Sequence, residues 1–124
     1  MDESLSMVGI TQEVDVSHKY SSVYSEEAVG NGGAHHKYAI RDKNGKLLAF
    51  IKFQDGAIKE SEVNGINQED LLAIVIDRLR GFQEGRYACR ENGIALGRVE
   101  EALMWLQRRT ADREKRGVEG TSKV

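Results

Sequence analysis

Five cations lie close together near the end of the chain, and they are the residues best suited to binding an anion. They are Arg108, Arg109, Arg113, Lys115 and Arg116. Residues 105–116 hold these five cations and two carboxylates, a net charge of +3, whereas the whole chain has a net charge of −2. A protein that binds long nucleic acid is usually basic over a broad surface. The local charge therefore favours a small anionic ligand.

Three of these cations continue an apolar stripe along a predicted helix. Steps of three and four residues place the following on one face: Asn92, Ala95, Val99, Ala102, Leu106, Arg109, Arg113 and Arg116. The middle of the stripe is apolar and its ends are polar, a pattern typical of a helix that pairs with another helix. In an antiparallel pair with a two-fold axis near residues 100–101, Asn92 of one copy meets Arg109 of the other. Within one chain these two residues are 17 positions apart, or about 26 Å along a helix.

An aromatic ring and an amide complete this predicted two-chain pocket. Phe82, near the end of the preceding helix, is expected close to Asn92 just past the turn. Arginine offers paired donors to phosphate, an aromatic face stacks on a base, and asparagine bonds to base edges or ribose hydroxyls. The combination suits a nucleotide-like anion. Each residue also has an ordinary structural interpretation: Phe82 as core, Asn92 as a cap, and Arg109 and Arg113 as a solvated helix end.

The elements that position these residues are two predicted helices. The first spans residues 67–84, with Asn67 as its N-cap and Gly85 at its end. The second begins at residues 88–90 and ends near Arg116, with Gly117 in the left-handed position that follows a helix. A tight turn joins them as an antiparallel hairpin. At about 40 Å, the second helix is too long for one small domain to bury, so we expect the hairpin to dimerise.

A meander of three antiparallel strands is predicted over residues 37–63. Asn44-Gly45 and Asp55-Gly56 are dipeptides favoured in two-residue type I′ turns between strands. Between the two turns, alternate residues from Leu47 to Phe53 form the better core face, which we expect the helices to cover. The segment 10–16 alternates like an edge strand, and 29–34 is predicted to be a flexible join.

Together these patterns predict an α+β fold in a single domain spanning 1–124. Its parts are an antiparallel sheet in 1–66, the helical hairpin in 67–117 and a tail in 118–124. A chain of 124 residues is long enough for one domain and hardly for two.

Other reactive residue types give little support for catalysis or for a metal. The pair His35-His36 is too isolated for a metal site, and Cys89 lacks the neighbours of a nucleophile, so we expect it to be inert packing. No Ser/His/Asp order, paired-carboxylate constellation or Walker-type glycine loop occurs in the sequence. The single cysteine fits a reducing cytosol, and neither a secretory signal nor a membrane span is predicted. We therefore expect a cytosolic binding protein without a cofactor.

The C-terminal two thirds of the chain resemble a known family. The segments "RLRGFQ", "ACREN" and "RRTADREKRGVEGT", preceded by "FIKFQDGAIKESEVNGI", are similar to the helical-hairpin family of phage anti-defence sponges. That family includes Thoeris-type and anti-CBASS members, and the preceding strands match the Thoeris type. The resemblance covers residues 38–124.

The resemblance implies a function that composition alone does not. Such proteins bind cyclic ADP-ribose isomers made by bacterial TIR-domain enzymes, in particular glycocyclic ADP-ribose, and hold them without degradation in the cytoplasm of the infected host. Some also bind cyclic di- or trinucleotides at separate sites and assemble as hexamers, a trimer of dimers. Carried over by position, the implied ligand contacts are Phe82, Asn92, Arg109 and Arg113, with Arg90, Arg116 and Thr121 as weaker candidates.

Two other functions remain open at this point. The chain is alternatively a dimeric interaction module whose basic helix end binds nucleic acid or an acidic protein. A less favoured alternative is an enzyme that cleaves the same cyclic ligand.

Overall fold

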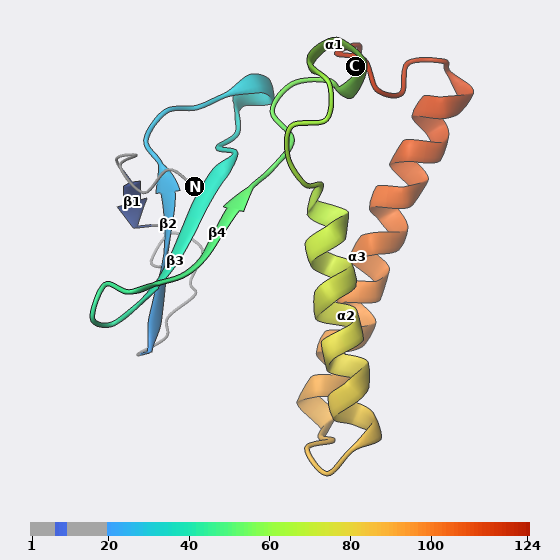
Figure 1. The fold of residues 1–124 in the computed structure, drawn as a ribbon. Coiled ribbons are helices and arrows are strands. Elements are labelled where there is room, and N and C mark those ends of the chain that lie inside the picture. The colour runs from blue at the N-terminus through green and yellow to red at the C-terminus, as the bar shows by residue number, and fades with distance from the viewer. Residues whose placement is uncertain (1–6, 10–19) are drawn as a thin grey trace. The chain divides into compact units, whose positions relative to one another are not determined.

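The structure is a computed structural model that describes residues 7–9 and 20–124 (Figure 1). The chain divides between Ile66 and Asn67 into two compact units, one with the strands and one with the two long helices. The predicted edge strand over 10–16 lies outside the described residues. The elements are β1 (Met7–Gly9), β2 (Ser21–Glu26), a 3-10 turn η1 (Asn31–Gly33), β3 (Lys37–Asp42), β4 (Leu47–Lys52), α1 (Ile58–Ser61), α2 (Gln68–Glu84) and α3 (Arg90–Lys115).

The first unit is a four-stranded antiparallel sheet in the order β1-β2-β3-β4 (Figure 1). This confirms the predicted α+β class, with a sheet followed by helices. The sequence interpretation missed β2, which pairs Val23 with Ile40, because its serine-rich sequence has little apolar alternation. Among the described residues, Ala39 and Ser25 are the most buried, each with 1% of its surface exposed. The expectation that the helices cover this sheet stays a prediction.

The turn between β3 and β4 differs from the prediction at Asn44-Gly45. Only Gly45 has a positive φ, 85°, so the two-residue type I′ turn is wrong. Residues 43–45 form a three-residue loop closed by a bond from the Asp42 amide to the Lys46 carbonyl, 2.9 Å. The Asp42 carboxylate accepts from the amides of Asn44 and Lys46, both at 2.9 Å. These side-chain bonds stabilise a wider loop than the dipeptide alone predicts.

The third strand predicted after Asp55-Gly56 is wrong. The chain instead forms the single helical turn α1, and only Ile66 returns to the sheet, through a parallel bridge to Phe53. Asn64 replaces the missing strand bonds, since its side chain bonds both the amide and the carbonyl of Asp55 at 2.8 Å. Local amide side chains that bond the backbone compete with regular strand pairing.

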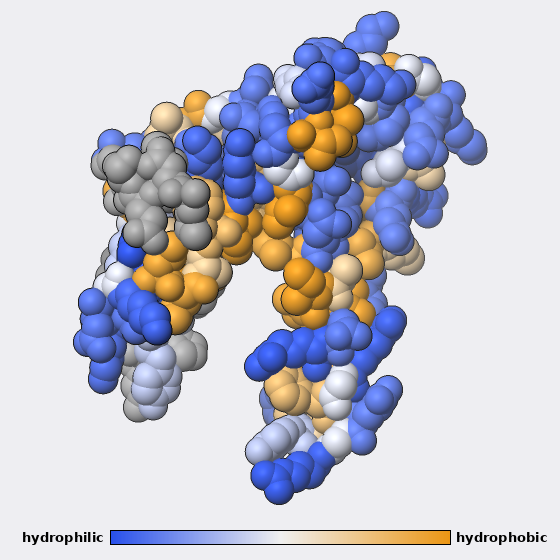
Figure 2. Space-filling view, viewed as in Figure 1, coloured by the Kyte–Doolittle hydropathy of each residue, from blue (hydrophilic) through white to orange (hydrophobic). Residues whose placement is uncertain are grey.

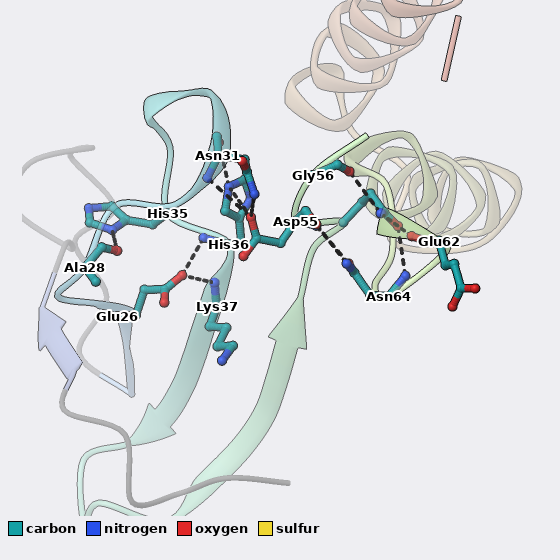
Figure 3. Close-up of polar contacts among 11 residues, drawn as sticks. Glu26, Ala28, Asn31, His35, His36, Lys37, Asp55, Gly56, Glu62 and Asn64 are labelled. Atoms are coloured by element: carbon teal, nitrogen blue, oxygen red, sulfur yellow. Dashed lines mark hydrogen bonds and ion pairs between the residues drawn. The ribbon is translucent and has the colours of Figure 1, made fainter. Parts of the chain in front are cut away.

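A cluster of polar contacts fastens the loop between β2 and β3 to the chain that follows β4 (Figure 3). The Asp55 carboxylate accepts from the side chain and the main chain of Asn31, at 2.8 and 3.3 Å. Nε2 of His36 donates to the Asn31 carbonyl at 2.8 Å and lies 3.5 Å from Asp55. The Asn31 side-chain bond, followed by its main-chain bond, lowers the pKa of Asp55 below its usual value. The predicted flexible join over 29–34 is therefore a bonded loop.

The second unit is an antiparallel hairpin of α2 and α3, as predicted (Figure 1). α2 begins after Asn67, whose amide donates to the Asp70 carboxylate at 2.9 Å, and ends before Gly85. α3 ends one residue before Arg116. No helix of the described residues is both long enough and apolar enough to span a bilayer.

The hairpin buries little of its own apolar surface. Ile76 is its one buried hydrophobic residue among those described. Five large apolar side chains of α2 and α3 are at least 42% exposed: Ile74, Val75, Ile94, Met104 and Trp105. Figure 2 shows apolar surface along the helices, between hydrophilic regions. Trp105 is 54% exposed, and the Arg108 guanidinium lies 5.5 Å from its ring centre.

Candidate functional site

The end of α3 and the following tail form a cationic concave surface, here called the tail pocket. Its volume is about 330 Å³. The lining residues are Arg109, Arg113, Arg116, Thr121, Ser122, Lys123 and Val124. The structure therefore brings together four of the seven residues predicted from the sequence. The lining contains three guanidinium groups and one ammonium group, which suit an anionic ligand.

The tail is positioned by the way α3 ends. The amide of Gly117 donates to the Glu114 carbonyl and that of Val118 donates to the Arg113 carbonyl, both at 3.0 Å. With Gly117 at φ 71°, this is a Schellman motif, which satisfies the last carbonyls of a helix. A second turn follows, closed by the Thr121 amide on the Val118 carbonyl at 3.1 Å, with Gly120 at φ 79°. Two left-handed glycines thus direct the tail across the helix end.

Arg113 holds this tail in place. Its guanidinium donates to the carbonyls of Lys123 at 2.7 Å and of Val118 and Thr121 at 3.0 Å. Its Nε lies 3.3 Å from the Glu119 carboxylate. Only 6% of Arg113 is exposed. A buried guanidinium is stable when its donors are used, so the interpretation of Arg113 as a solvated helix end is wrong.

Arg109 and Arg116 differ from Arg113 in exposure and in partners. Arg116 bonds the Asp112 carboxylate at 3.2 Å and the Val124 main-chain oxygen at 3.0 Å. Arg109 is exposed, and within the described part of the chain no carboxylate pairs with it. Of the predicted arginines in the tail pocket, Arg109 is the one whose guanidinium has no hydrogen-bond or ion-pair partner among the described residues.

The opposite end of the hairpin carries aromatic rings flanked by guanidinium groups. The rings of Phe82 and Tyr87 are 6.3 Å apart in an edge-to-face arrangement at 85°. The guanidinium of Arg78 lies 4.9 Å from the centre of the Phe82 ring, and that of Arg86 lies 5.1 Å from Tyr87. The edge of one ring is attracted to the face of the other, and each guanidinium is attracted to the electron-rich face of its ring. Phe82 is half-buried, which leaves part of the ring for stacking.

Asn92 bonds the main chain of Tyr87, the ring partner of Phe82, in the same turn. Its Nδ2 donates to the Tyr87 carbonyl at 3.4 Å, and its amide donates to Sγ of Cys89 at 3.4 Å. Cys89 is exposed and is the N-cap of α3, so its expected role as inert packing is wrong. The Gln83 side chain fixes the turn through two 3.0 Å bonds to the main chain of Cys89. Asn92 is thus held against the turn that carries Tyr87 and Cys89.

The predicted residues form two groups at opposite ends of the hairpin. Phe82, Asn92 and Arg90 lie at the turn, which is here called the turn end, and the other four lie at the tail pocket. Arg90 is exposed and is 4.0 Å from the Glu91 carboxylate. About 26 Å of helix separates Asn92 from Arg109. One chain therefore does not join the two groups around a small ligand.

Sequence reasoning missed several residues at both ends. At the turn end these are Arg78, Arg86 and Tyr87, and at the tail pocket Ser122 and Lys123. The aromatic in "GRYAC", five residues after Phe82 across the turn, was a usable signal for the first group. The tail has no helical or strand periodicity, so spacing gave no signal for the second.

His35 and His36 each use one ring nitrogen to bond the main chain of their own loop. Nδ1 of His35 donates to the Ala28 carbonyl at 2.9 Å, and Nε2 of His36 bonds the Asn31 carbonyl (Figure 3). Among the described residues, no group of three or more potential ligands gathers.

Comparisons with known proteins identify relatives of the chain. Residues 45–111 match the family model described as "Acb2/Tad1, hairpin domain", which covers more than half of the chain. The chain is 52% identical over 92 residues to "Thoeris anti-defense 1" from Bacillus phage SBSphiJ7. That match covers 74% of this chain and 64% of the relative's length.

Proposed function

The chain belongs to the Acb2/Tad1 hairpin family, and from that premise we propose that it is a phage anti-defence protein. In this proposal it binds a cyclic ADP-ribose-type signal, glycocyclic ADP-ribose, and withholds it from the TIR-derived defence system of the bacterial host. The protein acts in the cytoplasm of the infected cell. The relative named Thoeris anti-defense 1 supports this assignment.

The observation that carries the proposal is the gathering of Arg109, Arg113, Arg116 and Thr121 around the tail pocket. A cyclic ADP-ribose carries a diphosphate, a base and two riboses. Guanidinium and ammonium groups bind the phosphates, an exposed aromatic face stacks on the base, and an amide bonds the sugar hydroxyls or the base edge. The tail pocket supplies the first kind of group, and the turn end, with Phe82 and Asn92, supplies the others.

A complete pocket requires two copies of the chain. An antiparallel pairing of α3 about residues 100–101 brings the turn end of one copy to the tail pocket of the other, twice per dimer. The exposed apolar residues of the hairpin support such pairing, because surfaces of this kind are usually covered by a partner. Assembly of dimers into hexamers, and a separate site for cyclic di- or trinucleotides, stay predictions.

The proposed action is sequestration without catalysis. The tail pocket offers positive charge and hydrogen-bond donors to a diphosphate. A pocket that contributes only these groups lowers the free energy of the bound ligand without breaking a bond. Ligand released by heating should therefore have the mass of the intact cyclic molecule, whereas fragments would indicate hydrolysis.

Calorimetry with a panel of cyclic ADP-ribose isomers and cyclic oligonucleotides tests the proposal. We expect heat on addition of glycocyclic ADP-ribose and a stoichiometry of two ligands per dimer. The absence of binding to every cyclic ADP-ribose isomer would contradict the proposal. A salt series distinguishes the interaction module: a thousandfold or larger loss of affinity for DNA or RNA between about 50 and 200 mM salt indicates many phosphate contacts.

A further inference from the structure

Lys123 and the tail that presents it have no place in the site predicted from the sequence. Lys123 lines the tail pocket together with Arg109. Its main chain is fixed on both sides, since its amide donates to Oγ1 of Thr121 at 3.3 Å and its carbonyl accepts from Arg113 at 2.7 Å. Within the described part of the chain, no carboxylate lies within ion-pair distance of its ammonium. The tail therefore positions a cation whose charge is available to a ligand.

Arg113 uses its donors differently. Three carbonyl oxygens of the tail and the Glu119 carboxylate surround its guanidinium. A phosphate that used the same donors would have to displace these bonds, and only 6% of Arg113 is exposed. Arg113 is thus built to bind the tail, while Arg109 and Lys123 face the pocket without a competing carboxylate.

We propose that Lys123 is a ligand-binding cation of the tail pocket and that Arg113 is a positioning residue that acts through the tail. This inference rests on the proposed function and deepens it, because it names the cations that meet the diphosphate: Arg109 from α3 and Lys123 from the tail. Arg113 fixes the distance between them by holding the carbonyl of Lys123.

The proposal predicts a specific pattern of coupling between two substitutions. Lys123→Ala should weaken glycocyclic ADP-ribose binding about tenfold, the scale of one charge-assisted bond. In an Arg113→Ala background the tail is released and Lys123 is no longer positioned, so Lys123→Ala should then change affinity by less than about twofold. Two residues that contact the ligand independently would give additive effects.

The matched control is Lys115→Ala. It removes one positive charge, as Lys123→Ala does, but Lys115 is in the last turn of α3 and does not line the tail pocket. We expect it to leave affinity within about twofold of wild type after screening by salt. Equal losses for Lys115→Ala and Lys123→Ala would show that only the overall charge matters, and would overturn the proposal.

Native-state hydrogen exchange gives a readout independent of the ligand. The amides of Thr121 and Lys123 are bonded in the folded tail. In Arg113→Lys, which keeps the charge but loses the planar fork of donors, we expect these amides to exchange at least tenfold faster than in wild type, while amides in the middle of α3 are unchanged. Equal exchange in the two proteins would overturn the positioning role.

Inorganic pyrophosphate, as a second titrant, separates this proposal from the proposed function. One outcome is that wild type binds pyrophosphate, with weaker binding in Lys123→Ala, but does not bind glycocyclic ADP-ribose. That result would support Arg109 and Lys123 as the phosphate-binding cations and would overturn the proposed signal molecule. If glycocyclic ADP-ribose binds wild type and Lys123→Ala with equal affinity, the proposed function stands and the role of Lys123 is overturned. Failure of wild type to bind either titrant would overturn both.

Discussion

The two ends of the hairpin differ in how they hold their polar and aromatic groups. At the turn end, Phe82, Tyr87 and Asn92 are arranged by short contacts within one tight turn. At the other end, Arg113, which is only 6% exposed, binds the carbonyl oxygens of a tail without regular secondary structure. The tail then forms one wall of the tail pocket. One end presents rings and an amide and the other presents positive charge. A ligand with both a base and a diphosphate needs both ends, which one chain keeps about 26 Å apart.

The largest expected effect is at Arg109. Arg109→Ala should weaken binding of glycocyclic ADP-ribose by about 1.5–3 kcal/mol, because it removes charge-assisted bonds to phosphate. Calorimetry measures this directly. Arg98→Ala is the matched control, since Arg98 is exposed and lies only 3.8 Å from Glu101 in a surface pair, and such pairs contribute little. Equal affinity of Arg109→Ala and wild type would show that the tail pocket does not bind the ligand.

Phe82 tests the turn end. Phe82→Ala should weaken binding by about 1–3 kcal/mol through the loss of base stacking, whereas Phe82→Trp keeps an aromatic face and should retain most of the affinity. Thermal unfolding of both variants separates loss of stacking from loss of packing on Arg78 and Tyr87. Equal weakening in the two variants would mean that Phe82 acts as core and not as a stacking surface.

Gly117 tests whether the helix end determines the tail pocket. At φ 71°, Gly117→Ala places a side chain in the left-handed region and should lower the free energy of unfolding by about 1 kcal/mol. Gly97 lies inside α3 with nothing within 4 Å of an added Cβ, so Gly97→Ala should raise stability by about 0.5–1 kcal/mol. Denaturant unfolding of the two variants should therefore shift in opposite directions. A shift in the same direction for both would contradict the Schellman end.

The smallest effect lies outside the hairpin and serves as a control region. Asn31 lowers the pKa of Asp55, so the ionised carboxylate favours the folded sheet unit. That contribution is present above the unfolded pKa, about 3.9, and is lost as pH falls through the lower folded value. Carboxyl NMR should show Asp55 titrating below about 3.9, and Asp55→Asn should abolish this dependence while ligand affinity is unchanged. A midpoint at or above the ordinary value would contradict the Asn31 contacts.

The sequence predicted the hairpin well because its signals are local and repeated. Asn67 and Asp70 mark the start of α2, and Gly117 marks the end of α3 with an uncommon backbone conformation that glycine adopts readily. The apolar spacing between them repeats over several turns. The same pattern assigned Phe82 and Asn92 to the two sides of one short turn, where each contacts Tyr87.

The sheet unit and the tail were predicted less well for a different reason. The prediction of a third strand was wrong because the side chain of Asn64, nine residues away in sequence, bonds the backbone of Asp55. The role of Arg113 was missed because its partners are carbonyl oxygens, which every residue has. Contacts between a side chain and distant backbone atoms leave no periodic pattern, and only coordinates reveal them.

The central claim is that each pocket is built from the turn end of one copy and the tail pocket of another. Mixing two weakly binding variants tests it most directly, at a ligand concentration that fills only intact pockets. Phe82→Ala combined with Asn92→Ala damages only the turn end, and Arg109→Ala damages only the tail pocket. After co-refolding, half of randomly paired dimers are mixed, and each mixed dimer has one intact pocket, so about a quarter of wild-type sites should bind glycocyclic ADP-ribose. A mixture that binds no better than either variant alone would contradict the two-chain pocket.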